Sequence, residues 1–196
     1  MFFPLLVGAN YRHVYYAEAA SIIDPVRDGF EVQIHLPIPL HVKNFAVKGK
    51  GACVFTSGQM NANWHAYKPL YKMASKIDEG GGWPAKVDDL LKRLAPDLPY
   101  VQYEGVDPSG MEEALAEGRG VCATYGYGER YDMETIYHMV FLVHLDSEWA
   151  VIIDNNFPGT WERMPRDEFL RRWKHPGGEG WYYTFLLPPP PPIPHN

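Results

Sequence analysis

The first 50 residues show one clear alternation of apolar and polar positions. From Phe30 to Leu36 every second residue is apolar, and the residues between them are Glu, Gln and His. This period of two is typical of a strand with one buried face. Pro37 and Pro39 end the strand, because proline removes a backbone donor from the ladder. We expect the rest of residues 1–50 to be irregular.

Two helices are expected after this segment. A glycine turn at residues 49–51 leads into a predicted helix from Cys53 to about Tyr67, although Gly58 is a poor helix former. A second helix is predicted from Pro84 to Leu94, since proline suits the first helical turn and four apolar side chains recur on one stripe. A helix with one apolar stripe is expected to pack on a sheet.

The chain from residue 100 onward is mostly strands. We expect strands at Tyr100–Tyr103, Gly120–Tyr125, Ile136–Leu145, Trp149–Ile153 and Trp181–Leu187, and short helices at Met111–Ala116 and Pro165–Trp173. Residues 146–148 form a tight turn that joins the third and fourth of these strands into a hairpin. The pattern therefore predicts an α+β fold, with an N-terminal helical part packed on a C-terminal antiparallel sheet, in one domain over residues 1–187.

Residues 188–196 read as a polyproline tail. Five consecutive prolines are followed by Ile193 and Pro194, which favours a stiff polyproline II segment. Its only ionisable side chain is that of His195, so we expect it to serve assembly and not chemistry. The partners expected for it are further copies of this chain or a larger protein assembly.

Charge and cysteine content limit the classes of function. A formal net charge of −6 and a pI near 5.7 argue against a nucleic-acid partner. No apolar stretch is long enough to span a bilayer, so no membrane partner is expected. The two cysteines, Cys53 and Cys122, make no disulfide framework, which favours reduced thiols in a cytoplasmic setting. We expect neither a metal ion nor a cofactor.

Cys53 is a candidate nucleophile. It lies at the predicted start of a helix, where unpaired backbone N–H groups favour a thiolate and any oxyanion formed beside it. A cysteine near a helix start is more often an inert buried side chain. The nucleophilic interpretation therefore needs a base within hydrogen-bond reach.

His138 is the candidate base. If the hairpin turns near residues 146–147, His138 lies opposite a residue between Asp154 and Asn156, and opposite side chains on antiparallel strands are about 5 Å apart. An acid or an amide beside the histidine follows in any of these registers. Asp154, Asn155 and Asn156 are therefore all candidates to orient the ring.

The order of these elements resembles the papain-like cysteine peptidases, and more closely their bacterial branch of bacteriocin-leader-processing (double-glycine) peptidases. The segments that carry the resemblance are Glu112–Arg119, Val121–Thr124, His138–Val143, Val151–Asp154 and Glu168–Trp173. The resemblance implies a papain-like fold, with Cys53 as nucleophile, His138 as general base and acid, and Asp154, 16 residues on, as the orienting group. The family commonly has a glutamine six residues before the cysteine as an oxyanion donor, and this chain has Val47 there. Asn44 is the candidate substitute.

Two functions of different classes follow. The first is a thiol hydrolase that attacks an amide bond in a peptide or protein substrate through a Cys-His-Asp triad. The second is a catalytically inactive, peptidase-like structural or interaction protein, which the substitution at Val47 favours.

Overall fold

The described part of the chain, in a computed structural model, comprises residues 52–79, 82–126, 137–157 and 160–189, together with the backbone of three two-residue strands. These strands are β1 (Phe3–Pro4), β2 (Tyr16–Ala17) and β3 (Val32–Gln33), and the first two pair with each other. The predicted strand at 30–36 is described only at β3. The rest of that prediction lies outside the described residues.

Four short elements form the helical part that precedes the main strands. They are α1 (Ala52–Trp64), the 3-10 helices η1 (Lys68–Leu70) and η2 (Met73–Glu79), and α2 (Pro84–Leu94). The bounds of α2 are those predicted. The α1 helix ends three residues before its predicted end, because Ala66 takes a left-handed φ of 55° and Pro69 then prevents the helix from continuing.

The main sheet is antiparallel and contains seven strands in the order β3-β8-β7-β6-β5-β9-β4. Besides β3, its strands are β4 (Tyr100–Gly105), β5 (Val121–Thr124), β6 (Met139–Leu145), β7 (Trp149–Ile153), β8 (Thr160–Pro165) and β9 (Gly180–Phe185). The remaining helices are α3 (Ser109–Ala116) and α4 (Arg166–Trp173). The prediction of an α+β fold is confirmed.

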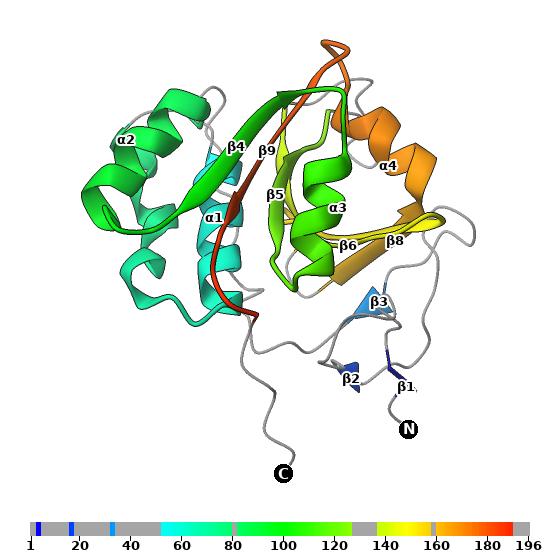
Figure 1. The fold of residues 1–196 in the computed structure, drawn as a ribbon, viewed down its shortest axis with the longest axis horizontal. Helices are drawn as coiled ribbons and strands as arrows, with labels where there is room; N and C mark the ends of the chain where they lie inside the picture. The colour runs from blue at the N-terminus through cyan, green and yellow to red at the C-terminus, as the bar shows by residue number, and fades with distance from the viewer. Residues whose placement is uncertain are drawn as a thin grey trace.

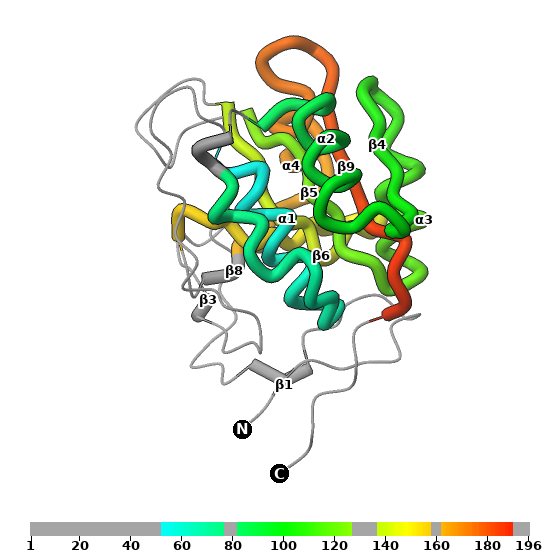
Figure 2. Tube along the Cα trace, turned by 90° about the vertical axis from the view of Figure 1, so that its left-hand side faces the viewer, coloured from blue at the N-terminus to red at the C-terminus, as the bar shows by residue number. Residues whose placement is uncertain are grey.

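The sheet is covered by helices on both faces, which gives three layers (Figure 1). Alternate residues of one strand enter different cores: Cys122 of β5 packs with α1 and α2, whereas Val121 and Ala123 pack with α3 and α4. Figure 2 shows α1 and α2 toward the viewer and α4 behind the sheet. None of the described helices has the length and apolar composition needed to cross a bilayer.

Strand β8 has no counterpart among the predicted strands. It pairs with β7, with Arg163 opposite Val151 and Glu162 opposite Ile152. Charged residues interrupt any apolar run in this segment, so its sequence carries no clear strand pattern. It is a strand because its backbone pairs with β7 on one side and with β3 on the other.

The start of the proline segment packs on the body of the protein. His65, just after α1, donates from Nδ1 to the carbonyl of Pro188 at 2.7 Å and accepts at Nε2 from the N–H of Gly120 at 3.3 Å. Burial lowers the pKa of His65 to about 4, and the nearby Arg119 acts in the same direction. Residues 190–196 lie outside the described residues, so an assembly role for the tail stays a prediction.

Candidate active site

Cys53 is the second residue of α1, at the helix start where it was predicted. It lies among the first backbone N–H groups, which have no partner within the helix. The first turns of α1 are held against the sheet by Tyr183 of β9, whose hydroxyl donates to the carbonyl of Val54 at 2.8 Å. A Cβ at Gly58 would lie 2.4 Å from that hydroxyl oxygen, so a residue without a side chain is needed for this approach.

His138 and Asp154 meet at the ends of β6 and β7. Nε2 of His138 lies 2.9 Å from Oδ1 of Asp154, and both side chains are buried. Since Phe141 pairs with Ile153, continuing the ladder would place residue 138 opposite Asn156. The contact is thus diagonal across the open end of the hairpin. It forms because the chain turns after β7, with the N–H of Asn156 donating to the Asp154 carboxylate at 2.8 Å.

The side chain of Cys53 lies close enough to His138 to act on the pKa of its ring. Burial alone would lower the pKa of His138, but the charge and hydrogen bond of Asp154, together with the contact to Cys53, raise it to about 10. A histidine that is held by a carboxylate and lies near a cysteine at a helix start is an arrangement that nucleophilic catalysis can use.

Asn155 does not orient His138. Its Nδ2 instead donates to the carbonyl of Cys53 at 3.2 Å, to the hydroxyl of Ser57 at 2.8 Å and to the carbonyl of Met139 at 2.8 Å. Because side chains of successive residues point in different directions, Asp154 and Asn155 cannot both face the same ring. Asn155 therefore lies against the start of α1 and of β6, and Asp154 is the candidate whose carboxylate contacts the ring.

The backbone of His138 is also anchored, from β5. The N–H of Tyr125 donates to the carbonyl of His138 at 2.9 Å. Tyr125 is itself held by Arg172 of α4, which donates to its hydroxyl at 2.5 Å and to Glu168 at 2.6 Å. Burial raises the pKa of Tyr125 well above its ordinary value, so the phenol stays protonated. The sequence gives no sign that His138 is supported in this way, because Tyr125, Glu168 and Arg172 come together only in the folded chain.

The other cysteine lies in a different environment. Cys122 is fully buried in β5, and burial raises the pKa of its thiol to about 12. It is therefore a natural internal control for the reactivity of Cys53.

The oxyanion donor and the metal site are the two remaining expectations. Asn44, the candidate oxyanion donor, and Val47 lie outside the described residues, so the first stays a prediction. Within the described ranges, no three His, Cys, Asp or Glu side chains gather in a way that could hold a metal ion.

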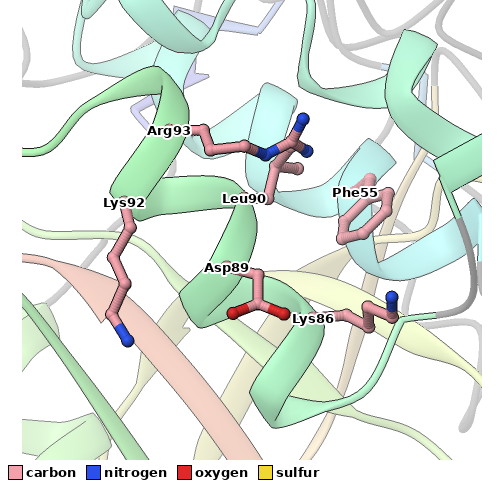
Figure 3. Close-up of a pocket in the computed structure, with 6 residues that line it drawn as sticks. All are labelled: Phe55, Lys86, Asp89, Leu90, Lys92 and Arg93. Atoms are coloured by element: carbon pink, nitrogen blue, oxygen red, sulfur yellow. The ribbon is translucent and has the colours of Figure 1, made fainter.

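A pocket of about 480 Å³ opens between α1 and α2, lined by Phe55, Lys86, Asp89, Leu90, Lys92 and Arg93. Figure 3 shows that Lys92 points away from the other side chains. None of Cys53, His138 and Asp154 lines it, so this pocket is separate from the candidate active site.

Comparison with known proteins gives a likeness in structure. No family model matches the sequence, and no curated protein matches it. Among solved structures, a crystal structure of a Bacillus anthracis protein named as a C39-like peptidase is similar, with a TM-score of 0.54 and 18% identity over 76% of this chain and 96% of that one. A likeness at this identity concerns the fold. The chain thus shares the α+β fold of that structure.

Proposed function

We propose that this protein is a cysteine peptidase-like thiol hydrolase that cleaves an amide bond in a peptide or protein. The observation that carries the proposal is the bond between His138 and Asp154, 2.9 Å long, beside a Cys53 side chain close enough to act on the pKa of the ring. The three groups have the chemical types, and the order of contact, that a nucleophile, a base and an orienting acid require. The likeness to a C39-like peptidase supports the same reaction class.

The reaction would proceed in two steps. In the first, the sulfur of Cys53 attacks the substrate carbonyl while His138 holds the thiol proton, which then passes to the leaving amine as the C–N bond breaks. The product is a thioester on Cys53. In the second step, His138 takes a proton from water, the resulting hydroxide attacks the thioester and expels the acid and the Cys53 thiolate, and His138 returns the proton to the sulfur. Asp154 keeps the ring oriented and stabilises its positive charge throughout.

Alkylation by iodoacetamide tests the nucleophile without knowledge of the substrate. At pH 7.5 a pKa of about 12 leaves roughly one Cys122 thiol in 30,000 ionised, so Cys122 should react very slowly in the folded protein. We expect Cys53 to be alkylated at least about 100-fold faster, as measured by mass spectrometry of the two peptides. The His138→Ala variant should lose most of this difference. Equal, slow reaction of both cysteines would contradict the proposal.

Peptide cleavage tests the reaction itself. The resemblance to the bacteriocin-leader-processing branch makes peptides with a double-glycine leader the first substrates to try, followed by a mixed peptide library. Cleavage should disappear in Cys53→Ser and persist in Cys122→Ser. Cleavage that survives Cys53→Ser would exclude Cys53 as the nucleophile.

The alternative function is that of an inactive peptidase-like structural or interaction protein. Two observations favour it: the side chains of the group have little access to solvent, with Cys53 5% and His138 7% exposed, and valine occupies position 47. This alternative predicts a protein that binds a partner, cleaves none of the peptides, and has a Cys53 as unreactive as Cys122.

A further inference from the structure

A row of buried polar residues follows α1 and the residue just after it, beside the apolar residues that pack in the core. Four polar or sulfur-containing residues recur at every fourth position, and residues four apart lie on one side of a helix. They are Cys53, Ser57, Asn61 and His65, all buried.

Each of these residues contacts a different point on the neighbouring strands or their ends. Cys53 lies beside His138, and the Ser57 hydroxyl donates to the carbonyl of Met139 at 3.0 Å. Farther along, Asn61 donates to the carbonyl of Gly120 at 3.0 Å, and His65 accepts from the N–H of the same glycine. Hydrogen bonds have narrow limits of distance and angle, so the series fixes both the rotation and the depth of α1 on the sheet.

Asn155 adds hydrogen bonds to the contact between the start of α1, near Cys53, and the sheet. Its single Nδ2 group bonds at once to the Cys53 carbonyl, the Ser57 hydroxyl and the Met139 carbonyl. Two of these acceptors belong to Cys53 itself and to the residue that follows His138. Asn155 and Ser57 thus connect the backbones on which the two reacting side chains are mounted.

The oxygen of the Asn155 amide is in a different situation from its nitrogen. Its Oδ1 is buried and has no hydrogen-bond partner among the described residues. The reverse orientation would turn that oxygen toward two carbonyl oxygens, which cannot donate to it. An amide that leaves one end unpaired in the interior opposes folding, and the three bonds of its Nδ2 act against that cost.

We infer that Asn155 and Ser57 are positioning residues, which hold the Cys53 side chain beside the His138 ring by joining the start of α1 to the start of β6. The inference rests on the proposed function, in which this contact is the reacting one. Neither side chain touches the substrate or takes a proton. They act through the geometry of the pair, where a displacement of about 1 Å is enough to lower a rate about 100-fold.

The test compares Asn155→Ala with Asn61→Ala. The two asparagines are closely matched: both are buried, both donate to a backbone carbonyl at about 3 Å, and both leave Oδ1 unpaired. Ser57→Ala serves as a milder second variant in case Asn155→Ala folds poorly. For each variant we would measure thermal stability, the rate of Cys53 alkylation as a function of pH, and the titration of the His138 ring by NMR.

We expect Asn155→Ala to slow the alkylation of Cys53 by about 10-fold or more and to move the His138 titration to lower pH, with Ser57→Ala changing both in the same direction. Asn61→Ala should lose comparable thermal stability and keep both properties within about twofold of wild type. The inference is overturned if Asn155→Ala and Ser57→Ala lose stability but retain the wild-type alkylation profile and His138 titration.

The proposed function can fail separately. A wild-type protein that cleaves no peptide contradicts peptidase activity, yet the NMR titration still decides whether Asn155 and Ser57 hold the Cys53–His138 contact. Conversely, cleavage that depends on Cys53 and His138 but is unaffected by Asn155→Ala and Ser57→Ala supports the function and rejects the positioning role.

Discussion

Replacing Asp154 by asparagine should change the charge of His138. Burial is the largest influence on the ring and lowers its pKa, and the carboxylate of Asp154 is the main group that opposes it. With the carboxylate present the pKa is about 10, so at pH 7 the charged ring outnumbers the neutral ring about 1000 to 1. In Asp154→Asn we expect the pKa to fall to about 6.5 or below, which makes the neutral ring the majority, by about 3 to 1 or more.

The same substitution should alter the pH dependence of stability. The folded-state pKa of His138 lies above its unfolded value, so the His138–Asp154 pair stabilises the fold fully below about pH 6.5 and this contribution is lost as the pH rises through about 10. The free energy of unfolding of the wild type should therefore approach that of Asp154→Asn between these two values. Urea unfolding at a series of pH values measures this difference.

Direct observation of the ring is the decisive assay. Nitrogen-detected NMR of His138 across pH 5–11 reports its titration in both proteins, and circular dichroism confirms that the variant is folded. Alkylation of Cys53 should slow in Asp154→Asn but less than in His138→Ala, because an asparagine can still hydrogen-bond to the neutral ring. If His138 still titrates near pH 10 in Asp154→Asn, the carboxylate is not the source of its charge and the orienting role assigned to Asp154 is wrong.

Two further predictions concern the support of α1 and of the proline segment. Both nitrogens of His65 can bond to the backbone groups of Pro188 and Gly120 only when the ring is neutral, and the pKa of the ring is lowered to about 4. Its contribution to the free energy of unfolding, up to about 3 kcal/mol, is therefore present above about pH 6.5 and is lost as the pH falls through 4. The difference in unfolding free energy between wild type and His65→Gln should shrink over this range, and a difference independent of pH would contradict this. Gly58→Ala would stabilise an exposed helix by about 1 kcal/mol, but here the new methyl group meets the Tyr183 hydroxyl and the side chain of Met73, so we expect a loss of about 1–3 kcal/mol. Tyr183→Phe should recover part of that loss in the double variant, and a Gly58→Ala protein as stable as wild type would show that the contact relaxes freely.

Local sequence patterns were sufficient to predict the structure wherever residues close together in the chain determine it. The α2 helix has its predicted bounds, since a proline at its start and an apolar stripe define it without help from distant residues. The contact between His138 and Asp154 was also predictable, because a short hairpin brings residues 16 apart together. Even there the register was determined by an irregularity between Leu142 and His144, which no turn rule anticipates.

Contacts between distant segments were decided only by the tertiary structure. Strand β8 is a strand because it pairs with β7 and β3, and its own charged sequence does not predict one. Asn155 and Ser57 are 98 positions apart, and nothing in either neighbourhood shows that they will bond. The four-residue spacing from Cys53 to His65 was visible in the sequence, but a polar stripe ordinarily marks the solvent side of a helix. Its burial here depends on partners supplied by the sheet, and hydrogen bonds of this kind form only once the whole fold has assembled.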